Sequence, residues 1–155
     1  MLKRYGWIAA LALMLDQLTK LWAQGLGDAR LVLLPGVVAL RYAENTGMAF
    51  SLLSGRSWLL GLISAAVIVL GLLALRRYRL GPLPSVAAML MLGGAAGNMI
   101  DRLLLGYVVD MFEVLLFRFA IFNVADAALT VGCVLMAASL LFNPKDWSDT
   151  HHADQ

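Results

Sequence analysis

Residues 57–75 read SWLLGLISAAVIVLGLLAL, with Arg56 and Arg76 at the two ends and no charged residue between them. An α-helix needs about 20 consecutive, mostly apolar residues to cross the hydrocarbon core of a bilayer, so this stretch predicts a transmembrane helix. The chain of 155 residues is 61% hydrophobic and 14% charged, a composition that argues against an ordinary soluble domain. Three further apolar stretches occupy about 5–23, 80–103 and 119–142, ahead of a polar tail at 143–155.

These stretches predict an all-α membrane protein with four transmembrane helices in a single membrane-embedded domain, 1–155. We expect 5–23 to be a retained helix rather than a cleaved signal peptide, because Asp16 and Lys20 interrupt its apolar run. Positive residues near helix ends mark the cytoplasmic side of a membrane protein. In a four-span arrangement one side collects Lys3, Arg4, Arg76, Arg77, Arg79 and Lys145. A multi-pass protein with both termini in the cytoplasm follows.

The first outer loop, about 24–56, carries the pattern of a β-hairpin. Residues 31–34 and the alternating residues 38–43 flank the turn pair Pro35-Gly36. We expect a small sheet here, lying on the outer membrane surface. The tail 143–155 is polar, and we expect it to be disordered.

Charged and amide side chains inside the apolar stretches gather at one depth. An ionisable residue at the centre of a membrane helix costs about 2.5–3.5 kcal/mol or more, so it suggests a functional site by default. Because a helix rises about 1.5 Å per residue, these groups all fall in the outer leaflet. They are Asp16 and Lys20 of the first stretch, Asn98, Asp101 and Arg102 of the third, and Asn123 and Asp126 of the fourth. The shared depth predicts one buried site.

Several of these residues also have a purely structural explanation. Asp16 and Lys20 are spaced i,i+4 and can pair on one helix face. Arg102 beside Asp101 can serve as an interfacial anchor, and Asn98 and Asn123 can join helices by hydrogen bonds. In the outer loop, Asn45 and Gly47 can simply form a turn. Asp126 is harder to explain, because no cationic residue lies within a helical turn of it in its own stretch.

Asp110, in the second outer loop, can reach Asp126 from above. Two carboxyl groups held close together at low dielectric share a proton, and such a pair can activate water while polarising a peptide carbonyl. The sequence suggests neither a metal site nor a cofactor, since its histidines, His151 and His152, lie in the tail and its single cysteine, Cys133, reads as a buried apolar residue. The net charge of +2 forms no basic stripe, which argues against nucleic acid as a partner.

Five blocks of residues, in order along the chain, resemble those of the lipoprotein signal peptidase (signal peptidase II) family. Each block is short, but five in order on a four-span hydropathy profile are specific. They are Asp16-Gln-Leu-Thr-Lys20, Asn45-Thr-Gly-Met-Ala-Phe50, Gly93-Gly-Ala-Ala-Gly-Asn-Met-Ile-Asp-Arg102, Val109-Asp110 and Phe122-Asn-Val-Ala-Asp126.

The resemblance implies an aspartyl endopeptidase of the bacterial inner membrane, with a small β-sheet cradle and an outer lid at its active site near the outer face. The family's catalytic pair corresponds to Asp110 and Asp126. Its supporting residues correspond to Asp16, Lys20, Asn45, Gly47, Asn98, Asp101, Arg102 and Asn123. The substrate it implies is a prolipoprotein in the membrane lipid, cut before a diacylglyceryl-modified cysteine. We expect a monomer without a cofactor. Residues 111–121 receive no role from the resemblance, although their apolar part, 114–119, suits a lid.

Two alternatives come from other classes of protein. A small transporter or proton relay also uses buried Asp, Lys and Arg residues, but a relay should spread them through the membrane. The inner halves of the apolar stretches contain no such residue. A structural subunit without an active site would tolerate Asp110→Asn and Asp126→Asn.

Overall fold

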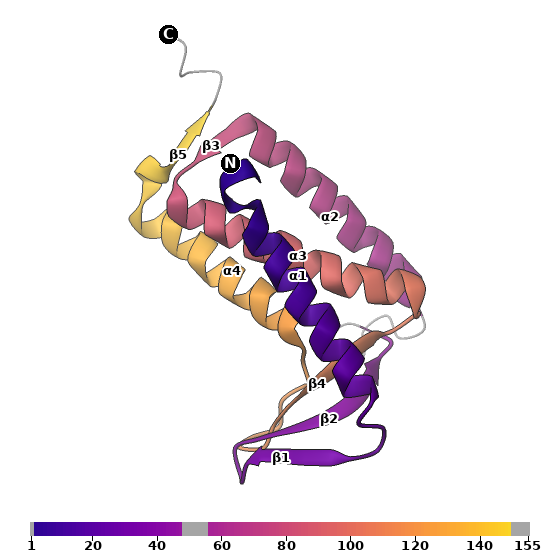
Figure 1. Ribbon diagram of the computed structural model, residues 1–155. Coiled ribbons are helices and arrows are strands. Elements are labelled where there is room, and N and C mark those ends of the chain that lie inside the picture. Colours follow the sequence, from indigo (N-terminus) through magenta and orange to yellow (C-terminus); the bar gives the residue numbers. More distant parts are fainter. Residues whose placement is uncertain (1, 48–55, 150–155) are drawn as a thin grey trace.

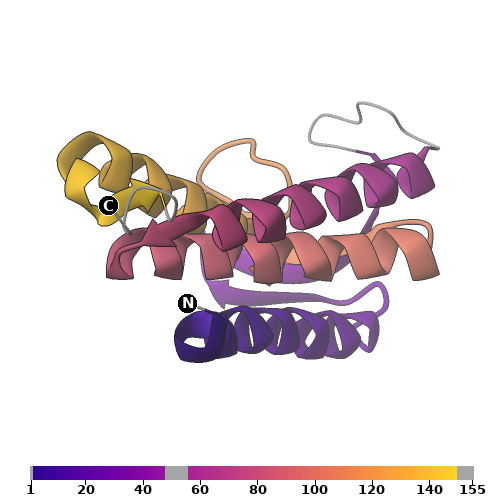
Figure 2. The ribbon, with the colours of Figure 1, turned by 90° about the horizontal axis from the view of Figure 1, so that it is seen from above.

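The computed structural model describes residues 2–47 and 56–149. Its four long helices are α1 (Leu2–Gln24), α2 (Ser57–Arg77), α3 (Pro82–Leu104) and α4 (Val124–Phe142). Helix α3 is central, because it packs against each of the other three (Figures 1 and 2). In Figure 2, α2 and α1 lie on opposite sides of it.

Within the described residues, three helices are long and apolar enough to cross a membrane: α2, α3 and α4. This confirms three of the four expected stretches. Helix α1 does not reach the same hydropathy, because Asp16, Gln17 and Lys20 fall in its second half. A membrane crossing by α1 stays a prediction.

Small residues let the helices approach α3 closely. A β-carbon on Gly93 would lie 2.6 Å from the carbonyl oxygen of Ala9 on α1, and one on Gly94 would lie 2.5 Å from the carbonyl oxygen of Ala125 on α4. Close backbone contact of this kind is how membrane helices gain packing energy where lipid is as apolar as the side chains. Glycine at these two positions therefore draws α1 and α4 onto α3.

A three-stranded antiparallel sheet covers one end of the helices, in the order β1 (Arg30–Leu34), β2 (Val38–Asn45) and β4 (Val108–Val114) (Figure 1). The predicted hairpin is confirmed as β1 and β2, joined by a turn in which Gly36 has a φ of 73°. The third strand was not predicted, because we placed Asp110 in a loop. Its buried side chains Val109 and Met111 pack with Ala23 at the end of α1, and this apolar contact anchors the sheet.

The fourth helix begins later than predicted. Residues 119–123 were expected to be helical, but α4 starts at Val124 with Asn123 as its N-cap. Before it, Phe122 forms an isolated bridge to Phe112 of β4, with their backbone groups hydrogen-bonded in both directions. Asparagine at the N-cap satisfies a free backbone N–H of the first turn, which fixes the start of the helix there.

The prediction of a disordered tail is wrong for residues 144–149. A 3₁₀ turn, Pro144–Asp146, leads into β5 (Trp147–Asp149), which pairs with β3 (Tyr78–Leu80) between α2 and α3. The indole N–H of Trp147 donates a hydrogen bond to the buried hydroxyl of Ser139. His151 and His152 lie outside the described residues. The prediction that Cys133 is buried is also wrong, because it is exposed on α4.

Candidate active site

The predicted polar residues meet where α1, α3 and α4 reach the sheet. Asp110 is only 2% exposed, and the pairing of β2 with β4 sets it opposite Ala43, two residues from Asn45. Its Oδ2 accepts a hydrogen bond of 3.0 Å from Nδ2 of Asn45, and its Oδ1 accepts one of 2.7 Å from Nδ2 of Asn123. Two amide donors therefore hold the carboxyl group in one orientation.

Asp126 is fixed by the start of α4. Its backbone N–H donates to Oδ1 of Asn123 at 2.8 Å, and its Oδ2 accepts from the backbone N–H of Asn123 at 3.3 Å, which completes a reciprocal capping box. Its Oδ1 accepts a bond of 2.7 Å from Nδ2 of Asn98 on α3. The local sequence thus positions Asp126 through helix capping, and a neighbouring helix holds it as well.

Two asparagines connect the two carboxyl groups. Asn123 donates to Asp110, Asn98 donates to Asp126, and Nδ2 of Asn123 also donates to Oδ1 of Asn98 at 3.1 Å. The structural alternative for Asn98 and Asn123, hydrogen bonding that joins helices, is therefore observed between them. Asp110 and Asp126 belong to one hydrogen-bond network.

The surroundings of Asp110 favour its protonated form. Burial raises the pKa of Asp110 to about 7, and the nearby negative charge of Asp126 acts in the same direction. The hydrogen bonds from Asn45 and Asn123 oppose this shift, because they stabilise the carboxylate. Near neutral pH, Asp110 can therefore both hold and release a proton.

A buried ion cluster lies behind the pair. The ammonium of Lys20 contacts Asp16 at 2.8 Å, Asp101 at 3.0 Å and Oδ1 of Asn98 at 3.0 Å, and all four side chains are at most 5% exposed. The expected i,i+4 pair of Asp16 and Lys20 is confirmed, but Lys20 also bridges to α3. One ammonium thus neutralises two buried carboxylates from different helices.

The same cluster holds the backbone beside each aspartate of the pair. Oδ1 of Asp16 accepts from the backbone N–H of Ala125 at 2.8 Å, next to Asp126. Oδ2 of Asp101 accepts from the backbone N–H of Val109 at 3.1 Å, next to Asp110. The ion cluster therefore connects α1 and α3 to the two segments that carry the pair.

A cavity of about 480 Å³ opens beside Asp126. Asn45, Arg102 and Thr130 supply its other polar side chains, and Phe119 and Phe122 are among its apolar walls. The guanidinium of Arg102 donates a bond of 3.5 Å to the carbonyl oxygen of Gly47, while its buried Nε–H has no hydrogen-bond partner among the described residues. The cavity can hold an extended chain of mixed polarity next to a carboxyl group.

All ten predicted site residues come together in this region. Asn45 and Gly47 also form the expected turn, since the backbone N–H of Gly47 donates to Oδ1 of Asn45. Residues 48–50 of the same sequence block lie outside the described residues. Among the residues that the structure describes, no three His, Cys, Asp or Glu side chains group as metal ligands do.

Sequence reasoning gave no role to Gln17. Its Nε2 donates to Oδ1 of Asp101 at 3.0 Å and to Oδ2 of Asp16 at 3.2 Å, so it joins the ion cluster from the side. The signal was its place between Asp16 and Lys20 in an otherwise apolar helix, where an amide also needs a partner.

Comparison with known proteins assigns the chain to a family. The family model of signal peptidase (SPase) II matches residues 8–142. The chain belongs to the signal peptidase II family. Lipoprotein signal peptidases of Trichormus variabilis and Streptococcus agalactiae are 45% and 39% identical to it, over 96% and 86% of this chain and 95% and 88% of their own. Membership in the signal peptidase II family makes the protein a peptidase of bacterial membranes.

Solved structures support the fold. A bacterial membrane enzyme solved at 2.3 Å resolution by the in meso method superposes with a TM-score of 0.87 at 26% identity, over 100% of this chain and 94% of that one. A second, solved at 1.9 Å, gives a TM-score of 0.79 at 27% identity, over 92% and 96%. The helices and the small sheet therefore form an arrangement already seen in membrane enzymes.

Gly97 gives the first test of how tightly the residues of the site are packed. A β-carbon at this position of α3 would collide with Oδ2 of Asp16, which is held by Lys20 and cannot swing away. We expect Gly97→Ala to lower the free energy of unfolding by about 1–3 kcal/mol, the usual cost of overpacking.

Thermal unfolding in detergent micelles measures this loss. Gly71→Ala on α2 is the matched control, because its β-carbon would meet only a Leu92 methyl group at 3.4 Å. Equal melting temperatures for the two variants would contradict the tight contact between Gly97 and Asp16.

Proposed function

We propose that the protein is an aspartyl endopeptidase that removes the signal peptide of lipidated prolipoproteins, with Asp110 and Asp126 as its catalytic pair. The observation that carries the proposal is the joining of two carboxyl groups, through Asn98 and Asn123, at a cavity bordered by Asp126. The relatives named lipoprotein signal peptidases support the substrate class.

The pair carries out hydrolysis by sharing one proton. With the proton on Asp110, its hydroxyl donates a hydrogen bond to the scissile carbonyl oxygen, and the carboxylate of Asp126 takes a proton from water. The resulting hydroxide attacks the carbonyl carbon and forms a tetrahedral intermediate. The proton on Asp126 then passes to the leaving amine as the C–N bond breaks, and Asp110 keeps its own proton.

The supporting residues hold this arrangement in place. Asn45 and Asn123 orient Asp110, Asn98 orients Asp126, and the cluster of Asp16, Lys20 and Asp101 fixes the backbone behind them. In this proposal, Arg102 and the carbonyl of Gly47 line the path of the substrate chain. No metal ion and no cofactor takes part.

The cleaved bond, in this proposal, precedes the diacylglyceryl-modified cysteine of the precursor. The chain acts as a monomer and a single domain that spans the inner membrane four times, with both termini in the cytoplasm. Its site then opens near the outer face, beside the acyl chains of the substrate and the membrane lipid. A proton relay is less well supported, because the halves of α2, α3 and α4 away from the site carry no ionisable residue except the exposed Cys133 and, in the last turn of α2, Arg76 and Arg77.

Purified protein mixed with a lipidated precursor tests the proposal directly. We expect release of the signal peptide and, by mass spectrometry, a product whose first residue is the lipidated cysteine. A precursor with alanine in place of that cysteine is the control and should stay intact. A lipidated precursor that stays intact, or a product cut at another bond, would contradict the proposal.

The apolar segment after β4 is proposed as a lid. Leu116, Phe117 and Phe119 are 64%, 61% and 57% exposed, and Phe119 both lines the cavity and contacts Phe117 edge to face. Replacing 115–117 by serines is expected to raise KM for the lipidated precursor about tenfold or more, since burying one such side chain contributes about 1.5–3 kcal/mol. Steady-state cleavage kinetics separate the change in KM from any change in kcat. An unchanged KM would exclude a lid that covers the substrate.

The rate of cleavage should depend on pH through Asp110. We expect kcat/KM to fall as the pH rises above about 7, because the group with this raised pKa then loses the proton that the carbonyl needs. Asn45→Ala removes a hydrogen bond that lowers this pKa, so the alkaline limb should move to higher pH. If the alkaline limb of the pH profile stayed at the same pH in Asn45→Ala, it would reflect a group other than Asp110.

The titration of Asp110 also makes the free energy of unfolding depend on pH, in the opposite direction to that of most acidic residues. The folded protein binds the Asp110 proton more tightly than the unfolded chain, whose carboxyl pKa is near 3.8. Its contribution therefore favours folding at low pH and is lost as the pH rises from 3.8 to about 7.

A further inference from the structure

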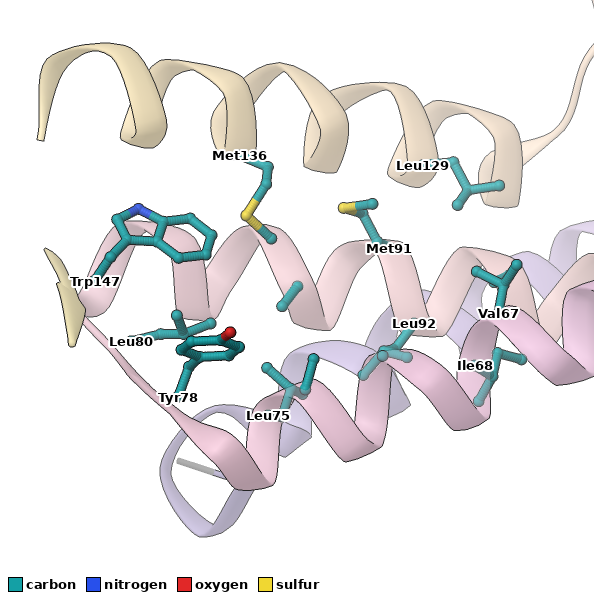
Figure 3. Close-up of a pocket in the computed structure, with 14 residues that line it drawn as sticks. Val67, Ile68, Leu75, Tyr78, Leu80, Met91, Leu92, Leu129, Met136 and Trp147 are labelled. Atoms are coloured by element: carbon teal, nitrogen blue, oxygen red, sulfur yellow. The ribbon is translucent and has the colours of Figure 1, made fainter. Parts of the chain in front are cut away.

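A second cavity lies between α2 and α4, against α3, and extends toward the end opposite the three-stranded sheet (Figure 3). It has a volume of about 190 Å³. Tyr78 of β3 and Trp147 of β5 close it at that end, and Met91 of α3 lies along its floor. The strand pair that the sequence did not predict thus forms part of a cavity wall.

The lining of this cavity suits hydrocarbon. Apart from Tyr78 and Trp147, its described lining residues are aliphatic, glycine or methionine. Apolar cavities of about 150 Å³ stay dry and bind small apolar molecules. Val67, on the rim, is 56% exposed on the surface of the chain. Since α2 is long and apolar enough to cross a membrane, we expect this rim to face acyl chains in a bilayer.

An arginine-lined cavity of about 430 Å³ adjoins it. Arg4, Arg76 and Arg79 supply its charge. Leu75, Tyr78 and Leu80 line both cavities, so the two share a wall along β3.

The charge around this end is mostly positive. The segments at this end are the start of α1, the end of α2, β3, and the 3₁₀ turn with β5. Their sequences contain two acidic residues, Asp146 and Asp149, and six cationic ones: Lys3, Arg4, Arg76, Arg77, Arg79 and Lys145. Basic pockets next to membrane helices attract anionic lipid headgroups. A ligand with one hydrocarbon end and one anionic end matches the two cavities together.

We propose that the two cavities form a binding site for an anionic phospholipid, with part of an acyl chain between α2 and α4 and the phosphate on the arginines of α1, α2 and β3. The bound chain fills the space that α2 and α4 leave above α3, and so supports the packing of both helices. The site lies apart from Asp110 and Asp126, and its occupation does not depend on the peptidase chemistry.

Lipid retention by the full-length protein tests the headgroup. After delipidation in detergent, native mass spectrometry compares phosphatidylglycerol with phosphatidylcholine of the same acyl chains. We expect phosphatidylglycerol to bind more tightly, and Arg76→Gln to weaken it about fivefold, which corresponds to about 1 kcal/mol for one basic residue near a headgroup. Arg56→Gln, at the other end of α2, is the matched control and should have no effect.

Substitutions in α2, which forms one wall of the cavity, test whether an acyl chain binds there. Ala74→Phe places a ring in the hydrocarbon space and should lower the binding of both lipids, whereas Leu73→Phe, on an exposed face outside the lining, should not. Gly71→Leu on the same wall repeats the test if Ala74→Phe unfolds. Thermal unfolding of each variant monitors the fold.

Four results would overturn the proposal. Equal binding of the two lipids with no effect of Arg76→Gln would remove the headgroup site. Inorganic phosphate that competes as strongly as the whole lipid would leave only an anion site. Lipid binding that survives both cavity-filling variants, or dimer formation that replaces lipid at these cavities, would exclude an acyl chain between α2 and α4.

Discussion

Replacing either Asp110 or Asp126 by asparagine is expected to lower kcat/KM for cleavage of a lipidated precursor by about 10²–10⁴-fold or more, the usual contribution of a positioned acid or base. An amide of the same shape can neither take a proton from water nor donate the carboxylic hydroxyl. Each variant lacks one half of the shared-proton chemistry, so both should lose activity to a similar degree.

The fold should survive both changes well enough to separate catalysis from stability. At position 126, the single amide oxygen can accept from the backbone N–H of Asn123 or from Nδ2 of Asn98, but not from both as the carboxylate does. At position 110, one new amide N–H₂ faces a donor on Asn45 or Asn123, so we expect a modest loss of about 1–3 kcal/mol from an unmatched polar contact. Thermal unfolding of both variants measures this part.

Glu113→Gln is the matched control for the pair. Glu113 lies on the same strand as Asp110, but its carboxylate contacts the exposed Arg30 at 2.8 Å. Its cleavage rate should match that of the unaltered protein. Normal turnover by Asp110→Asn or Asp126→Asn, with Glu113→Gln equally active, would refute the catalytic pair.

Lys20→Met should cause the largest loss of stability among single changes in the site. Lys20 is 2% exposed and is the cation that contacts Asp16 and Asp101, which are 0% and 3% exposed. Methionine has a similar length but leaves two carboxylates buried without a positive charge. Breaking a buried pair in this way costs about 3–5 kcal/mol.

Denaturant or thermal unfolding in micelles measures the effect, with Lys145→Met, at an exposed lysine after α4, as the control. Combining Lys20→Met with Asp16→Asn and Asp101→Asn should restore part of the lost stability, because neutral amides no longer need the cation. If Lys20→Met unfolded at the same temperature as the unaltered protein, the ion cluster would have no role in holding the helices together.

The polar layer could be predicted from the sequence because buried charge is costly. Asp16, Asn98 and Asp126 lie on three different helices, and the fixed rise of a helix was enough to bring them to one depth. The hairpin could be predicted because Pro35-Gly36 separates two short apolar runs. In both cases a local rule decides the outcome.

The parts that were missed depend on contacts between distant residues. Strand β4 pairs with β2, and nothing in Val108–Val114 alone distinguishes a strand from an apolar loop. The start of α4 was hidden because the apolar residues 119–122 continue the hydropathy of the helix, while the decisive cap is a single side chain, Asn123. Strand β5 forms only because β3, about 70 residues earlier, offers it a partner.

The amide of Asn98 has only one orientation that its neighbours permit. An ammonium group can only donate and an ionised carboxylate can only accept, so the oxygen must turn to Lys20 and the nitrogen to Asp126. The amide dipole is thereby aligned between a cation and an anion that do not touch. Through it, a lysine anchored on α1 polarises the very N–H that holds the carboxylate of α4, and adds no net charge to the space between them.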